Sequence, residues 1–258
     1  MLRFRSLASG SSGNATLVEA SDGSTSTRVL VDCGLGIRQM EQRLLSCDFG
    51  GAPALNAIFI THEHSDHIGC ALSLARRHRI PLWMSAGTWR ALGSSSDGLE
   101  VNLTRDGETV AIGDLELRPF TVPHDAAEPL QLRCTDGART FGLLTDLGHV
   151  PPHVLQNLQG CHSLLLECNH DPEMLANSSY PPFLKRRVGG SHGHLNNSQA
   201  AQALKALLHD GLHTVIAGHL SERNNHANLV QAALSDVLGC SPDTVQFCTP
   251  TGTDWYGV

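Results

Sequence analysis

The sequence predicts an α/β fold of four layers, in which two β-sheets pack face to face and helices cover the outer side of each sheet (αββα). Three observations support this prediction. Short β-rich runs gather in both halves of the chain, helical runs lie between them, and no linker or low-complexity segment divides the 258 residues. Because sheets and helices each bury an apolar face, this order of elements suits two sheets that share an inner core. We expect one domain over residues 1–258.

In the N-terminal half, Gly- and Ser-rich turns separate runs that have the composition of strands. The expected strands are 4–7, 16–19, 28–31, 56–60, 81–84, 101–103 and 109–112. Apolar residues at helical spacing predict helices over 35–45 and 68–78.

In the C-terminal half the same criteria predict further strands and helices. The expected strands are 115–122, 130–134, 140–145, 163–167, 214–217 and 244–247, and the expected helices are 152–157, 197–209 and 225–238. Asparagines precede the helix at 197–209, which is a favoured start signal. The two halves echo each other weakly, since 56–62 (NAIFITH) and 214–219 (TVIAGH) are both apolar strands that end in histidine.

The composition restricts the class of protein. Hydrophobic residues make up 41% and charged residues 17%, as in a folded globular chain. No apolar run approaches the about 20 residues of a membrane helix, and residues 1–7 lack a signal-peptide core, so we expect a cytoplasmic protein without a membrane partner. The eight cysteines form no Cys-x-x-Cys pair, which argues against a zinc ribbon. The net charge of −7 argues mildly against a large nucleic-acid footprint, although a metal site would add positive charge.

The strongest functional signal is the segment 61–67 (THEHSDH), which directly follows the expected strand 56–60. In an extended loop alternate side chains share one face, so His62 and His64 can bind one metal ion. Asp66 and His67 stand at the turn into the next helix and can point at a second ion. A metal ion takes about four ligands including water, so this cluster needs further residues.

Three more candidates stand at the ends of expected strands. His124 follows the strand 115–122, Asp146 follows 140–145, and His219 follows 214–217. Each alone could be a structural polar residue. Their order and their placement at strand ends, together with the segment 61–67, predict a metal site that binds two ions.

This ordered set resembles the metallo-β-lactamase fold superfamily, and the resemblance extends over the whole chain. It implies the αββα sandwich and a dinuclear site at the sheet edges. One metal ion would take His62, His64 and His124, the other would take Asp66, His67 and His219, and Asp146 would bridge both. Such a set of imidazoles and carboxylates suits zinc, manganese or iron, so the identity of the ions stays open.

Shorter segments resemble the YycJ/WalJ-type group, whose members are described as 5′→3′ DNA exonucleases. These segments are 9–14 (SGSSGN), 145–148 (TDLG), 166–171 (LECNHD), 193–197 (GHLNN) and 218–225 (GHLSERNN). The chain departs from the group at Asn196, where serine is common, and at Cys168, where a smaller polar residue is frequent. Only 72 residues separate Asp146 from His219, too few for the extra domain that β-CASP nucleases insert there.

The resemblance implies hydrolysis of a phosphodiester. Two divalent ions would bind a bridging water and lower its pKa toward about 7, which supplies hydroxide as the nucleophile. Asp66 and His194 are the candidate catalytic residues. His194 resembles the catalytic histidine of tRNase Z-type relatives and would protonate the leaving oxygen; an orienting or helix-capping role is its alternative.

Other residues are candidates for supporting roles. The backbone of the Ser- and Gly-rich segment 9–14 could bind a phosphate, with Ser9, Ser11, Ser12 and Asn14 as the contact residues. Asp32 is expected to orient the histidine-rich loop through hydrogen bonds, and His170 is expected to lie near the metal site, just outside the direct ligands. Tyr180 and the basic segment 185–187 could contact a substrate backbone.

Four functions remain open at this stage. The first is a DNA exonuclease, with DNA as substrate. The second is a small-molecule phosphodiesterase, for instance for cyclic phosphates, which the acidic net charge favours. Thioester or lactam hydrolysis is the third, because a fold does not fix a reaction. A non-catalytic metal-binding regulator is the fourth, although a complete set of seven ligands argues against it.

Overall fold

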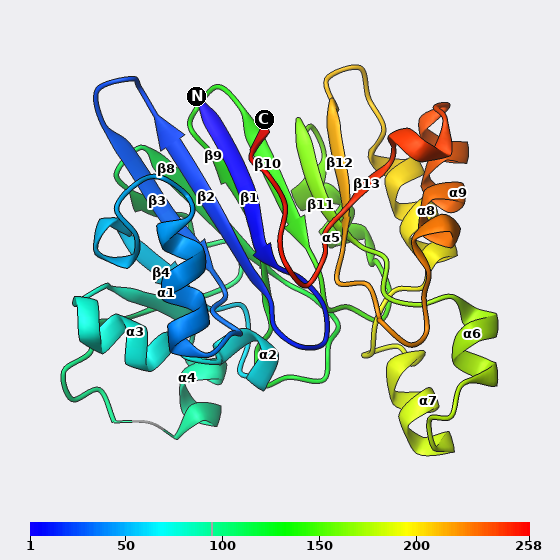
Figure 1. Cartoon of the computed structure of the whole chain (residues 1–258), viewed down its shortest axis with the longest axis horizontal. Helices are drawn as coiled ribbons and strands as arrows, with labels where there is room; N and C mark the ends of the chain where they lie inside the picture. Colours follow the sequence, from blue (N-terminus) through cyan, green and yellow to red (C-terminus); the bar gives the residue numbers. More distant parts are fainter. Residues whose placement is uncertain (94) are drawn as a thin grey trace.

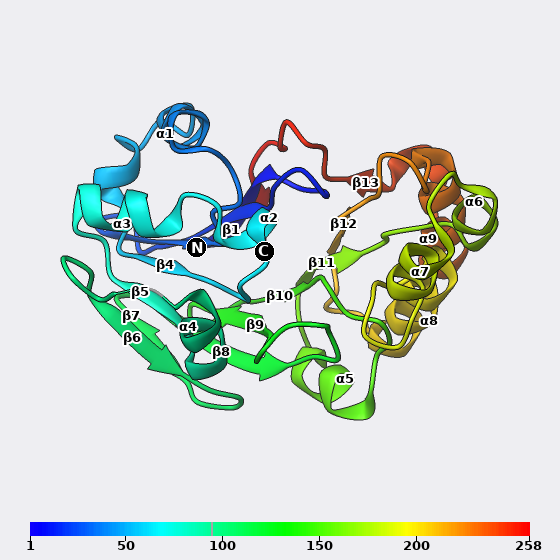
Figure 2. The same cartoon turned by 90° about the horizontal axis from the view of Figure 1, so that it is seen from below.

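The computed structural model describes residues 1–93 and 95–258, and within them the strands form two seven-stranded sheets that face each other (Figures 1 and 2). The first sheet has the order β14 (Tyr256–Gly257), β1 (Leu2–Ala8), β2 (Ala15–Ser21), β3 (Ser26–Val31), β4 (Ala57–Phe59), β5 (Leu82–Ser85) and β6 (Val101–Thr104). The second has the order β13 (Gln246–Phe247), β12 (Thr214–Gly218), β11 (Ser163–Glu167), β10 (Thr140–Leu144), β9 (Leu130–Thr135), β8 (Leu115–Thr121) and β7 (Val110–Ile112).

Helices cover the outer face of each sheet. The first sheet packs against α1 (Ile37–Leu45), α3 (Ala71–His78) and α4 (Ala86–Leu92), and the second against α5 (Pro152–Leu158), α8 (Asn197–Leu207) and α9 (Ala227–Leu238). The remaining helices are α2 (Ser65–Ile68), α6 (Pro172–Asn177) and α7 (Pro182–Val188), with short 3-10 turns at Ala52–Ala54 and Pro242–Thr244. None of the helices in 1–93 and 95–258 has both the length and the apolar character of a membrane span.

Three separate apolar cores hold the four layers together. One lies between the first sheet and its helices, one between the two sheets, and one between the second sheet and its helices. Strand β3 contributes to two of these cores, because alternate side chains of a strand point to opposite faces of the sheet. Leu30 belongs to the outer core, while Val29 and Val31 belong to the core between the sheets. The predicted αββα architecture is therefore confirmed.

The two sheets repeat one topology. In each, four strands are antiparallel (β14-β1-β2-β3 and β7-β8-β9-β10) and the run continues with parallel strands from β3 and from β10. In each sheet an aspartate directly or closely follows the strand at which the pairing changes from antiparallel to parallel. These residues are Asp32 after β3 and Asp146 after β10, and both have a positive φ (61° and 54°). Since carboxyl ends of parallel strands meet at one edge, both carboxylates lie where the metal ligands gather.

The structure departs from the sequence prediction at several helices. The predicted helix over 68–78 starts later, as α3 at Ala71, because the short helix α2 ends at Ile68 and the chain turns at Gly69 with φ of +32°. A Cβ atom at Gly69 would lie 2.4 Å from the carbonyl oxygen of Cys33, so a side chain has no room there. The helices α4, α6 and α7 and the strand β14 were not predicted. The eight cysteines are free thiols, and seven of them are buried.

Candidate metal centre

The histidine-rich loop begins where β4 ends, and Asp32 holds it in place. The buried Asp32 carboxylate accepts a hydrogen bond from the backbone N–H of Thr61 at 2.9 Å and one from Nδ1 of His67 at 2.8 Å. On the other side of the loop, the backbone N–H of Asn14 donates to the carbonyl oxygen of Asp66 at 2.7 Å. These contacts fix the loop that carries four of the seven expected ligands.

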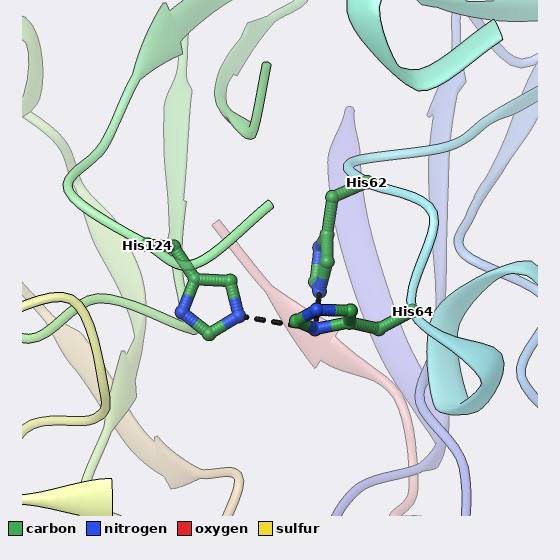
Figure 3. A group of neighbouring side chains, drawn as sticks. All are labelled: His62, His64 and His124. Carbon is green, nitrogen blue, oxygen red and sulfur yellow. Dashed lines mark hydrogen bonds between the residues drawn. The ribbon is translucent and has the colours of Figure 1, made fainter. Parts of the chain in front are cut away.

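The first group of candidate ligands consists of His62, His64 and His124 (Figure 3). Nδ1 of His64 lies 3.1 Å from Nε2 of His62 and 3.3 Å from Nε2 of His124. The three ring nitrogens lie within 4.8 Å of one another, so one cation could be bound by all three. His62 and His124 are buried, while His64 is partly exposed.

The second group consists of Asp66, His67 and His219, and it joins the two sheets. Oδ2 of Asp66 lies 3.6 Å from Nε2 of His67 and 3.8 Å from Nε2 of His219. Asp66 and His67 lie in α2, shortly after β4, whereas His219 follows β12 in the other sheet. Segments about 150 residues apart in sequence thus supply ligands to one point, as expected for a site at the sheet edges.

Asp146 lies between the two groups. Its Oδ2 is 3.3 Å from Nε2 of His67, its Oδ1 is 3.2 Å from Nδ1 of His219, and it clusters with His62 as well. The buried Oδ2 of Asp146 and the buried Nε2 of His219 have no hydrogen-bond partner among the residues that the structure describes. Because buried polar atoms nearly always have a partner, these two atoms together with the surrounding imidazoles and carboxylates fit a bound divalent cation.

Most of the histidines use their second ring nitrogen for a protein contact. Nδ1 of His67 donates to Asp32, Nδ1 of His124 donates to the carbonyl oxygen of Gly193 at 3.1 Å, and Nδ1 of His219 donates to Glu167 at 2.9 Å. Such contacts fix the tautomer and leave Nε2 free for a metal ion.

Glu167 is a functional candidate that the sequence analysis passed over. It ends β11, is fully buried, and its Oε1 accepts hydrogen bonds from Nδ1 of His219 and, at 2.8 Å, from Nδ1 of His194. Its Oε2 accepts from the backbone N–H groups of Leu147 and Leu195. The signal in the sequence is a single acidic residue that ends an apolar strand (LLLE).

His194 stands beside both groups of ligands. Its ring centroid lies 5.3 Å from that of His124 and 5.1 Å from that of His219. Because Nδ1 is engaged by Glu167, Nε2 is the nitrogen left to act on a substrate in the adjoining cavity.

Burial and neighbouring charges set the protonation of the cluster. Burial alone would raise the pKa of Asp146, but His219 and His67 hold it well below its usual value. Burial would also raise the pKa of Glu167, but His194 and His219 lower it to about 2. Burial would lower the pKa of His219, but Asp146, Asp66 and Glu167 raise it to about 10. The carboxylates are therefore ionised, as binding of a cation requires.

A cavity of about 290 Å³ opens onto this cluster. It is lined by Ser11, His64, Ser65, Asp66, Asp146, Arg187, His194 and His219. The guanidinium of Arg187 comes from α7 and donates through Nε to Asp125 at 2.5 Å. One cationic side chain thus reaches the rim of a cavity whose floor carries the carboxylates.

The Ser- and Gly-rich segment 9–14 is divided between two roles. Ser9 and Asn14 are buried: the Ser9 hydroxyl accepts from the backbone N–H of His219 at 2.8 Å, and the Asn14 amide donates to Oδ2 of Asp66 at 3.3 Å. Ser11 and Ser12 are exposed, and Ser11 lines the cavity over the cluster. Only these two serines face open space where a phosphate could be bound.

His170 is buried behind this region. Its backbone carbonyl accepts a hydrogen bond from the N–H of Asn197, and its Nδ1 has no hydrogen-bond partner among the residues that the structure describes. No hydrogen bond joins its ring to one of the seven candidate ligands within 1–93 and 95–258. Asp32, in contrast, contacts His67 directly.

Comparisons with known proteins agree with this geometry. The family described as "Beta-lactamase superfamily domain" matches residues 27–219. An exodeoxyribonuclease WalJ from Streptococcus pneumoniae is 34% identical, with 97% of this chain and 95% of that protein covered. An exodeoxyribonuclease YycJ from Bacillus anthracis is also 34% identical, with 92% and 89% covered. A solved structure of the metallo-beta-lactamase fold protein YhfI from Bacillus subtilis has a TM-score of 0.75 at 18% identity, with both chains covered in full.

Proposed function

The chain belongs to the beta-lactamase superfamily and to its YycJ/WalJ-type group, and on that premise we propose that it is a 5′→3′ DNA exonuclease. It is a metal-dependent hydrolase that fits a nuclease or phosphodiesterase. The observation that carries the proposal is the near full-length similarity to relatives named exodeoxyribonucleases, in a chain whose histidines and aspartates cluster as a metal site needs.

We propose that the site binds two divalent ions, zinc, manganese or iron. His62, His64 and His124 would hold one ion, Asp66, His67 and His219 the other, and Asp146 would contact both. When bound, such ions supply a water of lowered pKa as nucleophile and neutralise negative charge on phosphoryl oxygens. The partly exposed Asp66 lies at the cavity, so it would act in catalysis as well as in binding the ion.

His194 is proposed to give a proton to the leaving oxygen of the substrate. Glu167 accepts from Nδ1 of His194, which leaves Nε2 facing the cavity. The buried carboxylate also holds the orientation of the His194 ring through this hydrogen bond. A histidine placed in this way can act as a general acid.

Two elements of the cavity rim are proposed to position the phosphodiester. Ser11 offers a hydroxyl and its loop backbone, and Arg187 offers a guanidinium held by Asp125. Ser12 would contact the substrate just outside this cavity, while Ser9 and Asn14 would act by fixing His219 and the loop around Asp66. Asp32 would act in the same way, through His67. His170 is proposed to support the site without a hydrogen bond from its ring to a candidate ligand in the described residues.

The proposal is tested with duplex DNA labelled at either the 5′ or the 3′ end and digested by metal-loaded protein. We expect wild-type protein to release labelled mononucleotides from 5′ ends first, and Asp66→Ala to release none. Binding should weaken steeply with salt, through loss of phosphate contacts. An enzyme that leaves DNA intact but hydrolyses a small cyclic phosphodiester, with little dependence on salt, would contradict the proposal and support the small-molecule alternative.

A further inference from the structure

A second cavity adjoins the one over the metal cluster. It has a volume of about 160 Å³ and is lined by Ser11, Ser12, Tyr180, Ser221, Glu222 and Arg223. Ser11 lines both cavities, so the two meet at this residue. Tyr180 lies between α6 and α7, and residues 221–223 follow the metal-site residue His219. Figure 1 shows α6 and α7 at the same edge of the molecule as α2, which carries Asp66.

The lining of this cavity offers contacts that the protein itself does not use. Tyr180 is partly buried, and its hydroxyl makes no hydrogen bond among residues 1–93 and 95–258. Glu222 and Arg223 are exposed, and neither forms an ion pair within the described part of the chain. The wall therefore offers a ligand the aromatic side chain of Tyr180, the positively charged hydrogen-bond donor of Arg223 and the negatively charged acceptor of Glu222.

The wall is also held firmly relative to the metal cluster. The backbone N–H of Ser221 donates to the carbonyl oxygen of Asn169 at 2.9 Å. The backbone N–H of Asp171 donates to the carbonyl oxygen of Asn224 at 2.8 Å. The buried Asn224 in turn donates from its backbone to the Ser221 hydroxyl at 3.2 Å. These contacts fix the loop after His219, so the cavity is preformed rather than created by binding.

The opposite charges of Glu222 and Arg223 in the wall restrict the class of ligand that the cavity can bind. A phosphate would be repelled by the Glu222 carboxylate, so the lining is poorly suited to a lone anion. A nucleobase carries hydrogen-bond donors and acceptors on its edge and a π-face that can stack on an aromatic ring. Arg223 and Glu222 match such an edge, and Tyr180 offers the ring. A volume of about 160 Å³ is below that of a typical pocket for a whole drug-sized ligand, so it suits one base.

We infer that this cavity is a nucleoside subsite, which holds the base of one of the two nucleotides flanking the scissile phosphate, with Tyr180 stacked on that base. The inference rests on the proposed nuclease function and extends it. A phosphate bound at the metal cluster places the neighbouring nucleoside beside Ser11, where the second cavity begins. Since every base has a π-face, stacking there would tolerate any sequence, as an exonuclease that removes successive nucleotides needs.

The test compares Tyr180→Ala with Tyr180→Phe on duplex DNA whose first or second nucleotide carries either a base or an abasic sugar. On ordinary DNA we expect Tyr180→Ala to lower kcat/KM by about fivefold or more, and Tyr180→Phe to match wild type because it keeps the ring. With an abasic sugar at the contacted position, wild type and Tyr180→Ala should become equal. Arg223→Ala should raise KM more than Arg118→Ala. Arg118 on β8 is the matched control, because it is also an exposed arginine without an ion pair in the described part of the chain.

Two results would overturn the inference. One is a Tyr180→Ala enzyme as active as wild type on ordinary DNA. The other is a loss of activity that persists both with the abasic sugar at the first position and with it at the second, since it would then not come from stacking on a base. Wild-type digestion of ordinary DNA tests the proposed function separately: if that digestion fails, the proposal and the inference fall together, and if it succeeds, only the variants decide the inference.

Discussion

Replacing Glu167 by glutamine should damage the metal centre although it preserves the shape of the side chain. The two carboxylate oxygens of Glu167 accept from four donors in total. Oε1 accepts from the ring nitrogens of His194 and His219, and Oε2 accepts from the backbone N–H groups of Leu147 and Leu195. A glutamine has only one acceptor atom, and its amide group is itself a donor.

The size of the effect follows from these contacts. Whichever way the amide of Glu167→Gln is turned, its NH₂ group faces two N–H donors, so two donors lose their partner. They are two buried backbone N–H groups in one orientation, and the rings of buried His219 and partly exposed His194 in the other. Each such loss costs about 1–3 kcal/mol, which gives about 2–6 kcal/mol for the pair. If the amide faces the backbone, stability falls, and Tm should drop by at least roughly 4 °C. If it faces the imidazoles, metal affinity falls by about 10–100-fold, as for other residues that orient a metal ligand.

The assay combines thermal unfolding with metal affinity from competition against a chelator. Glu19→Gln is the matched control, because Glu19 is also a buried carboxylate but pairs with Arg3 and Arg28 away from the cluster. The control should lower stability and leave metal affinity unchanged. A Glu167→Gln protein with both the Tm and the metal affinity of wild type would refute the reasoning.

Three further predictions follow from the same site. His194→Asn should lower kcat by about 10²–10⁴-fold with nearly unchanged metal affinity, measured by single-turnover hydrolysis, if His194 is the general acid; equal losses of both would assign it an orienting role instead. Removal of the metal by a chelator should lower Tm, since an ion at about 100 times its Kd contributes about 2.7 kcal/mol, and an unchanged Tm would exclude a metal bound in the fold. Metal affinity should rise between pH 7 and pH 10. Burial lowers the pKa of His219, but Asp146, Asp66 and Glu167 raise it to about 10, so the metal-free ring keeps a proton until the pH passes that value. A metal affinity that stays constant across this range in a chelator titration would contradict the prediction.

The fold and its family could be predicted because their signals are local. The segment 61–67 places four ligand-type side chains within six residues, and the strands are marked by apolar runs between Gly- and Ser-rich turns. Membership of the superfamily and the αββα sandwich are both confirmed. The weak echo between 56–62 and 214–219 corresponds to strands β4 and β12, which lead to His62 and His219 in separate sheets.

Contacts between distant segments could not be predicted in the same way. Glu167 acts on His194 and His219, which lie 27 and 52 residues further along the chain, and no local pattern reveals such a pairing. Ser9 looked like part of a phosphate loop because of its glycine and serine neighbours, yet its hydroxyl is turned inward to the backbone of His219. The side a loop residue faces depends on tertiary contacts, which the spacing of residues does not encode.

The short helices α6 and α7 were missed for a different reason. Both begin with proline at the first helical position, Pro172 and Pro182, which is a start signal. Their lengths of six and seven residues are too short for helical periodicity to appear in a sequence window. Their position matters nevertheless, because α7 brings Arg187 to the metal cavity and the turn before it brings Tyr180 to the adjoining one.

The most direct test of the account is reconstitution of metal-depleted protein with Mn²⁺ or Zn²⁺, with bound metal and release of 5′-mononucleotides from duplex DNA measured in the same titration. The account predicts no release from the metal-free protein, release that grows as the second ion per chain is bound, and none at any metal concentration for Asp66→Ala. DNA hydrolysis by the metal-free protein, or full activity of Asp66→Ala, would contradict it.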